Sequence, residues 1–195
     1  MTALSGPEIG PAVGLFGGSF NPAHRGHLHV AQAGLRELQL DQVWWLVSPQ
    51  NPLKPAQPSA ASRSDTIRAL GLPRAMLVSH VESELGTRYT VDLIRALRRR
   101  HPSTRFVFMM GADNLLQLPQ WREWQAIAQL VPLAVIARPG ASVRARLGQA
   151  ARMMADSRVP ERRAHTLKDC NPPAWTYLTL PLNPLSSTAL RAASS

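Results

Sequence analysis

Residues 17–27 of this chain read Gly-Gly-Ser-Phe-Asn-Pro-Ala-His-Arg-Gly-His, between an apolar run at 12–16 and a helix-like segment. The apolar run predicts a strand, and the glycines after it let backbone N–H groups approach an anion. Two histidines, His24 and His27, stand three residues apart where the next helix opens. Free amides and the positive end of a helix dipole both attract phosphate, so this stretch predicts a phosphate site.

Similar apolar, β-favouring runs recur along the chain, with helix-like segments between them. Several of these runs lack polar alternation, as expected of strands that are buried on both faces of a parallel sheet. We therefore expect an α/β, Rossmann-like doubly wound fold, with a mostly parallel sheet of five to six strands and helices on both faces. The predicted strands are 13–16, 43–47, 76–81, 106–110, 133–137 and 175–180, and the predicted helices are 27–39, 64–70, 91–100, 122–128 and 143–155.

The chain is expected to form a single domain over 12–195, preceded by a flexible N-terminal tail at 1–11. A proline-rich stretch at 48–58 is unsuited to helix or central strand, and 157–173 is also predicted to be irregular. In doubly wound sheets, ligands bind beyond the carboxyl ends of the strands, where the strand order reverses. The loops that follow strands are therefore the expected location of the functional residues.

The composition limits the possible classes of function. The 195 residues carry a net charge of +10, with 45% apolar and 17% charged residues, which fits a globular core. No apolar run is long enough for a membrane helix, the start does not resemble a secretory signal, and Cys170 is the single cysteine. We expect a cytoplasmic protein with no membrane partner.

The positive charge suits nucleic-acid binding or a solvated basic surface. The second is favoured because the basic stretch 144–163 lacks interleaved aromatic side chains, so no nucleic-acid partner is expected. The sequence does not indicate an oligomeric state.

The glycine–histidine stretch differs from the common phosphate-binding motifs, because neither Gly-x-Gly-x-x-Gly nor Gly-Lys-Ser/Thr is present. Its pattern resembles the signature of the nucleotidylyltransferase superfamily, whose members transfer a nucleoside monophosphate from a triphosphate. Asn21 is a departure, since aspartate is commoner there, although asparagine also supports a turn. Residues 185–191, Leu-Ser-Ser-Thr-Ala-Leu-Arg, resemble the second half of that signature. Alone, such a run usually caps a helix.

The histidines have three possible roles. His24, His27 and His29 together suggest a metal site, but no cysteine or glutamate motif lies nearby to complete a ligand set. Either His24 or His27 could instead be a buried structural side chain. We favour contact with a triphosphate, where an imidazole donates to the charge that develops in the transition state. No metal-ligating residues are therefore predicted.

Further short segments resemble bacterial nicotinate-nucleotide adenylyltransferases, and the resemblance extends from about residue 13 to 191. Each segment is modest alone, and their joint presence in this order carries the comparison. The segments are Asn51-Pro52-Leu53-Lys54, Arg88-Tyr89-Thr90, Gly111-Ala112-Asp113, Leu118-Pro119-Gln120-Trp121 and Arg138-Pro139-Gly140.

The resemblance implies an ATP site, with His24, His27 and Arg191 as the catalytic residues. Asp113 follows a predicted strand and would accept hydrogen bonds from the ribose hydroxyls. Hydroxyls, amides at a helix start and an arginine suit the β- and γ-phosphates. The predicted ATP-binding residues are Gly17, Gly18, Ser19, Phe20, His24, His27, Gly111, Asp113, Ser186, Ser187, Thr188 and Arg191.

The resemblance also implies a site for nicotinate mononucleotide. Lys54 would meet the 5′-phosphate, and Trp121 would stack on the pyridine ring. Thr90 and the backbone N–H of Arg122 would meet the carboxylate, which favours the acid over the amide. Otherwise Thr90 is expected to cap the helix at 91–100. The predicted residues are Asn51, Lys54, Tyr89, Thr90, Trp121, Arg122 and Arg138, the last being equally well explained as a loop arginine.

The implied reaction transfers AMP from ATP to nicotinate mononucleotide, giving deamido-NAD and pyrophosphate. The acceptor's own phosphate would attack the α-phosphorus in line, so catalysis would be positioning and charge stabilisation. The expected cofactor is Mg²⁺ carried with ATP. The alternatives are another acceptor, such as nicotinamide mononucleotide, phosphopantetheine or flavin mononucleotide, a basic nucleic-acid-binding protein, or an inactive relative.

Overall fold

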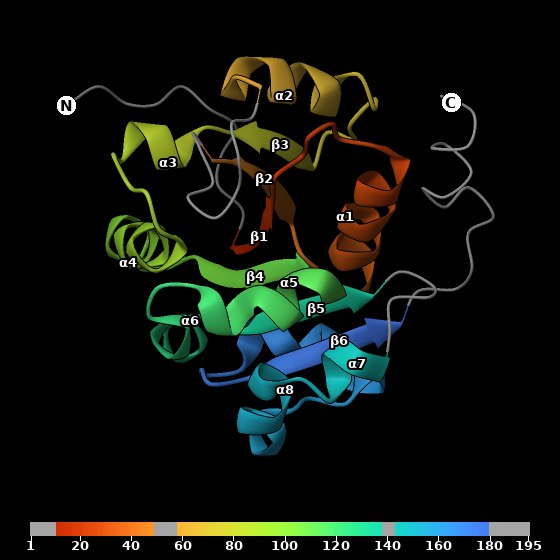
Figure 1. Ribbon diagram of the computed structural model, residues 1–195, viewed down its shortest axis with the longest axis vertical. Coiled ribbons are helices and arrows are strands. Elements are labelled where there is room, and N and C mark those ends of the chain that lie inside the picture. Colours follow the sequence, from red (N-terminus) through yellow and green to blue (C-terminus); the bar gives the residue numbers. More distant parts are fainter. Residues whose placement is uncertain (1–10, 49–57, 138–142, 180–195) are drawn as a thin grey trace.

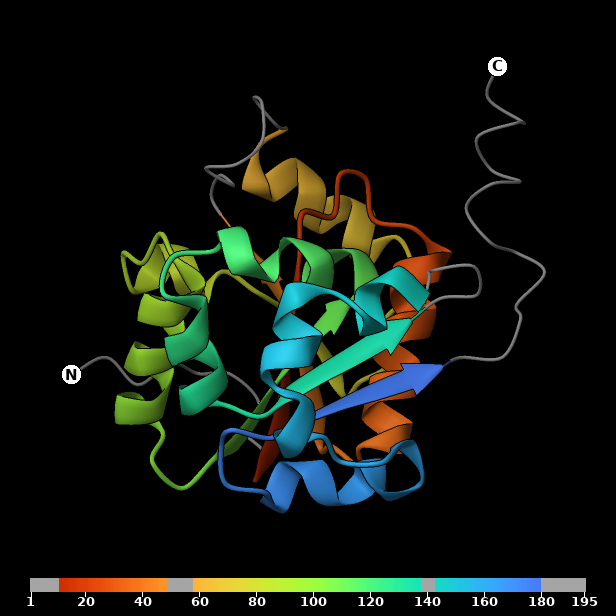
Figure 2. The ribbon, with the colours of Figure 1, turned by 60° about the horizontal axis from the view of Figure 1, so that its bottom comes forward.

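The computed structural model describes residues 11–48, 58–137 and 143–179 and contains a six-stranded, all-parallel sheet (Figure 1). The strand order is β3-β2-β1-β4-β5-β6. Figure 2 shows the neighbouring strands β5 and β6 running in the same direction. The strands are β1 (Ala12–Gly18), β2 (Gln42–Val47), β3 (Met76–Ser79), β4 (Arg105–Gly111), β5 (Leu133–Ala137) and β6 (Trp175–Thr179).

Helices cover both faces of the sheet, so the expected doubly wound fold is confirmed. One face packs against α3 (Val81–Glu84), α4 (Thr90–Arg100), α5 (Ala112–Gln117), η1 (Leu118–Gln120), α6 (Trp124–Leu130), α7 (Val143–Arg146) and α8 (Gln149–Met153). The other packs against α1 (Arg25–Glu37), α2 (Ala60–Arg68) and η3 (Glu161–Asp169), and a short turn, η2 (Ala155–Ser157), follows α8.

Strand β1 shows why both faces are apolar. Side chains alternate across a strand, so Val13 and Leu15 enter one core while Ala12 and Phe16 enter the other. All four are at most 3% exposed. Alternating polar residues would all lie on one face of the sheet and would require that face to contact water. Because helices cover both faces here, the strands are continuous apolar runs.

The strand order reverses at β1. The chain proceeds from β1 to β2 and β3 on one side, then returns to place β4, β5 and β6 on the other. Strands β1 and β4 are therefore parallel neighbours, with Phe16 opposite Met109. The loops after these two strands leave the same edge side by side, which is where an open α/β sheet binds ligands.

All six predicted strands are present, but some boundaries differ. The strand predicted at 76–81 ends at Ser79, because the Ser79 hydroxyl accepts the Val81 N–H at 3.3 Å and turns the chain into α3. Thr90 is the first residue of α4 rather than its cap; Tyr89 occupies the cap position, without a side-chain cap hydrogen bond.

The other differences lie toward the C-terminal end. The helix predicted at 143–155 is two helices, because Gly148 adopts an extended conformation and is the N-cap of α8. The stretch 157–173, predicted to be irregular, contains η3. Helix α1 begins two residues before the predicted 27, α2 four residues before the predicted 64, and α6 two residues after the predicted 122. Within the described residues, no helix is both long and apolar enough to cross a membrane.

Candidate active site

The glycines at the end of β1 are needed for packing as well as for access to an anion. Gly17 and Gly18 are the last residues of β1 and pair with Leu46 and Val47 of β2. A Cβ on Gly17 would lie 2.8 Å from Cζ of Phe108, and one on Gly18 would lie 2.7 Å from the Phe20 ring. Any larger residue would therefore displace an aromatic ring.

Phe20 anchors the turn that follows β1. Its side chain is fully buried, and its ring packs against Phe16, Trp45 and His27 with centroids 5.1–5.4 Å apart. Its φ of 45° is a left-handed conformation, rarely adopted by a bulky residue. The ring belongs to the core, so Phe20 could meet ATP only through its backbone.

His24 and His27 form a reciprocal cap at the start of α1. His24 Nδ1 accepts the Gly26 N–H at 3.1 Å, and His27 Nδ1 accepts the His24 N–H at 3.3 Å. An Nδ1 that accepts a hydrogen bond carries no proton, so the neutral rings have theirs on Nε2. Their centroids lie 3.9 Å apart. The cap therefore presets two adjacent Nε2–H donors, a role that needs no charged imidazolium.

His29 is set apart from this pair. Its Nε2 is buried and has no hydrogen-bond partner in the described part of the chain. No group of three or more His, Cys, Asp or Glu side chains among the described residues could hold a metal ion. The Nδ1 atoms of His24 and His27 are engaged by backbone N–H groups.

The end of β4 supplies the other half of the switch point. Gly111 is the last residue of β4 and caps α5, and Asp113 is exposed in the first turn of that helix. A Cβ on Gly111 would lie 2.5 Å from Oδ1 of Asp113. Glycine thus lets the carboxylate fold back over the end of the strand.

The residues predicted to bind nicotinate lie on two adjoining segments. The Arg122 guanidinium lies over the Tyr89 ring, 4.7 Å from its centroid, and the Trp121 ring meets Phe108 of β4 edge-on, with centroids 6.1 Å apart. Thr90 begins α4, next to Tyr89. Among the described residues, no backbone carbonyl accepts the Arg122 N–H.

An ion pair ties these two segments together. Arg95 of α4 donates to Glu123, with Nη2 and Oε2 2.6 Å apart. Glu123 follows Arg122 directly and has a φ of 50°. The hydrogen bond from Arg95 lowers the pKa of Glu123, so the carboxylate is ionised at neutral pH. The tertiary contact therefore fixes the turn that carries Trp121.

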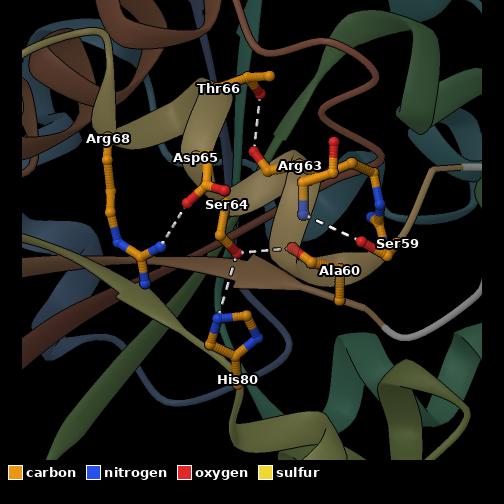
Figure 3. Close-up of polar contacts among 9 residues, drawn as sticks. Ser59, Ala60, Arg63, Ser64, Asp65, Thr66, Arg68 and His80 are labelled. Carbon is orange, nitrogen blue, oxygen red and sulfur yellow. Dashed lines mark hydrogen bonds and ion pairs between the residues drawn. The ribbon is translucent and has the colours of Figure 1, made fainter.

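Helix α2 contributes polar contacts that the sequence did not reveal (Figure 3). Arg63 and Ser64 are 1% and 0% exposed, although both are polar. The Ser64 hydroxyl donates to the Ala60 carbonyl at 2.8 Å and lies 3.1 Å from His80 Nε2, and Thr66 donates to the Arg63 carbonyl at 2.7 Å. No pattern in 59–68 distinguishes these side chains from an exposed helical face, so only the structure could identify them.

The pKa values of Arg63 and Glu82 are both shifted by burial and by the charge of the other side chain. Burial lowers the pKa of the Arg63 guanidinium, while the charge of Glu82 raises it. Burial raises the pKa of Glu82 to about 7, and the charge of Arg63 limits that rise. A carboxyl that titrates near neutrality therefore lies within electrostatic reach of the buried arginine.

The remaining predicted site residues lie outside the described residues. They are Asn51, Lys54, Arg138, Ser186, Ser187, Thr188 and Arg191.

Comparison with known proteins gives a consistent result. The cytidylyltransferase-like family model matches residues 15–193. A protein of Caulobacter sp. (strain K31) named probable nicotinate-nucleotide adenylyltransferase is 51% identical over 181 residues, covering 92% of this chain and 96% of its own. Proteins of the same name from Cereibacter sphaeroides (strain ATCC 17025) and Ruegeria pomeroyi are 50% and 46% identical, covering 92% and 94% of this chain and 96% and 87% of their own lengths.

Solved structures agree on the fold. The nicotinic acid mononucleotide adenylyltransferase of Plasmodium falciparum complexed with NaAD has a TM-score of 0.66 and 16% identity, covering 93% of this chain and 82% of its own. The same protein complexed with APC has a TM-score of 0.65 and also 16% identity, covering 93% and 83%. The resemblance inferred from the motifs is confirmed along nearly the whole length, and the chain belongs to the nicotinate-nucleotide adenylyltransferase family of cytidylyltransferase-like proteins.

Proposed function

We propose that this protein transfers the adenylyl group of ATP to nicotinate mononucleotide, forming nicotinic acid adenine dinucleotide and releasing pyrophosphate. The main supporting observation is the switch point between β1 and β4. It brings the His24–His27 cap and Asp113 to the same edge of the sheet, although nearly 90 residues separate them in the chain. Membership of the family supports the same reaction.

ATP would bind across this switch point. The ribose hydroxyls would donate to Asp113, and the triphosphate would lie over the turn that follows β1, near the N-terminus of α1. The Nε2–H groups of His24 and His27 would donate to non-bridging phosphate oxygens, whose negative charge grows in the transition state. Ser186, Ser187, Thr188 and Arg191 complete the proposed contacts to the β- and γ-phosphates on the strength of their motif.

The acceptor would lie toward α4 and the turn before α6. Trp121, held edge-on against Phe108, would stack on the pyridine ring. The Thr90 hydroxyl at the start of an 11-residue helix and the Arg122 N–H would donate to the carboxylate. An uncharged amide gains less from these donors, which is the basis for selectivity. Asn51, Lys54 and Arg138 are proposed as the remaining contacts from their motifs.

The reaction requires no protein base, because the acceptor phosphate is already ionised at neutral pH. Its oxygen forms the new bond to the α-phosphorus as the bond to the β-phosphate oxygen breaks, and the electron pair leaves with pyrophosphate. The chain's part is to hold the two phosphates in line and to stabilise charge. Mg²⁺ would enter bound to the triphosphate and water, as part of the substrate.

The decisive experiment compares acceptors. The purified protein is given ATP and Mg²⁺ with nicotinate mononucleotide or nicotinamide mononucleotide, and pyrophosphate and dinucleotide are quantified. We expect the higher kcat/KM with the acid. A preference for the amide would overturn the acceptor assignment, and transfer only to phosphopantetheine or flavin mononucleotide would replace it. Salt-sensitive oligonucleotide binding, without pyrophosphate release from any acceptor, would refute the enzyme.

A further inference from the structure

Helix α2 contacts the turn after β1 from the side of the core through Arg63 and Thr66, neither of which is itself a proposed substrate contact. We propose that Arg63 and Thr66 are positioning residues, which hold this turn in the geometry that adenylyl transfer requires. The inference rests on the proposed function, but it concerns two residues to which neither the motifs nor the family resemblance assigns a role.

Thr66 holds one end of the turn. Its Oγ1 accepts the Ala23 N–H at 3.1 Å and donates to the Arg63 carbonyl at 2.7 Å. Because the hydroxyl proton is directed to that carbonyl, a lone pair is left for Ala23. Ala23 immediately precedes His24, which caps α1 and is linked to His27. A shift of Ala23 would therefore move both imidazoles.

Arg63 holds the other end of the turn and the neighbouring strand end. Its Nη1 donates to the Ser19 carbonyl at 3.1 Å, its Nε donates to the Pro58 carbonyl at 3.0 Å, and its Nη2 donates to the Ser48 carbonyl. The planar guanidinium presents several donors in fixed directions, which lysine cannot reproduce. One buried side chain thus fixes Ser19, after β1, relative to Ser48, after β2.

Ordinary core packing does not account for these residues. Ile67 is the fully buried apolar side chain of α2, whereas Arg63 is buried to 1% exposure beside it. Burying a charged group is costly unless hydrogen bonds compensate, and here the compensating acceptors are backbone carbonyls of loops at the carboxyl edge of the sheet. Ser64 provides a contrast, since it lies against His80 and not against the turn.

The main test removes the Thr66 hydroxyl while keeping its shape. Thr66→Val should lower kcat about 10- to 100-fold, because a displacement of about 1 Å costs on the order of a hundredfold in rate. The KM values for ATP and mononucleotide should change less than threefold. Thr66→Ser, which restores the hydroxyl, should recover most of kcat.

Thr166→Val is the matched control. The Thr166 hydroxyl donates to the Arg163 carbonyl at 2.9 Å, three residues back, as Thr66 does to Arg63. Thr166 lies in the C-terminal half of η3, whose last residue, Asp169, contacts Arg105, the first residue of β4, at the amino edge of the sheet. We expect its kcat to stay within twofold of the wild-type value.

Two further measurements keep the proposal falsifiable. Amide hydrogen exchange at Ala23 should speed up at least tenfold in Thr66→Val, and Arg63→Lys should lower kcat at least tenfold in folded protein. Unchanged exchange at Ala23, kcat within twofold in folded Thr66→Val, or failure of Thr66→Ser to recover kcat would each overturn the positioning role. A wild-type protein that releases no pyrophosphate would instead refute the proposed function, whatever the exchange at Ala23 shows.

Discussion

Replacing Glu82 with glutamine is expected to stabilise the fold at alkaline pH and to have little effect in acid. Glu82 lies in the first turn of α3, directly after the end of β3. Burial raises the pKa of this carboxyl from 4.5 to about 7, against the opposing attraction of Arg63. The neutral form therefore suits the folded protein, and glutamine is a neutral side chain of nearly the same shape.

The sign and size of the effect follow from proton linkage. With the higher pKa in the folded state, that state binds the proton more tightly, so ionisation of Glu82 favours unfolding. The penalty is small below about 4.5, grows as the pH rises, and is complete above about 7. At about 1.4 kcal/mol per pKa unit, the full penalty is about 3 kcal/mol.

The assay is urea unfolding of the wild type and Glu82→Gln at pH 5 and pH 8.5. The gain in unfolding free energy from the substitution should be about 2–3 kcal/mol larger at pH 8.5. Glu84→Gln, an exposed change in the same helix, is the control and should show no such difference. An equal effect of Glu82→Gln at both pH values would refute the argument from burial.

Three other substitutions test the site. His27→Ala should lower kcat at least about a hundredfold in steady-state kinetics, because it removes a transition-state donor. His27→Asn has a side-chain oxygen that can replace Nδ1 in the cap but has no counterpart of Nε2. It should therefore recover the thermal stability lost in His27→Ala without recovering kcat. Trp121→Ala should chiefly raise the KM for nicotinate mononucleotide in initial-rate assays, and a change in kcat alone would contradict stacking. Gly17→Ala should lower the unfolding free energy by about 1–3 kcal/mol, because its Cβ would lie 2.8 Å from the Phe108 ring; unchanged urea unfolding would show that the ring yields freely.

The strands were predictable because burial on both faces leaves a local mark in the sequence. The runs that become β1 and β5 are apolar without interruption, and their burial on two helix-covered faces is the cause. Helix boundaries were less predictable because single residues set them. Ser79 turns the chain out of β3, and Gly148 separates α7 from α8.

The glycine–histidine motif could be identified from the sequence, but its internal geometry could not. The motif predicted donors at His24 and His27, and the hydrogen bonds show that Nδ1 of each ring accepts a backbone N–H. The glycines were expected to admit an anion, and the fold adds that they also make room for Phe20 and Phe108. The roles of Arg63 and Thr66 could not be predicted, because a buried polar face of a helix and an exposed one have the same sequence pattern.

The strand–helix alternation, the two candidate phosphate motifs and the resemblance to the family could all be identified from the order of the amino acids, since each depends on residues close together in the chain. Which residues from distant parts of the chain become neighbours at the site is set by the tertiary structure. The order β3-β2-β1-β4-β5-β6 places Asp113 at the same edge of the sheet as the glycine–histidine turn, and folding buries Arg63 against the carbonyls of Ser19 and Ser48. Every residue has a backbone carbonyl, so the sequence does not indicate which carbonyls will accept hydrogen bonds from a distant side chain. The contacts that orient the site therefore form only when the sheet brings distant loops to one edge.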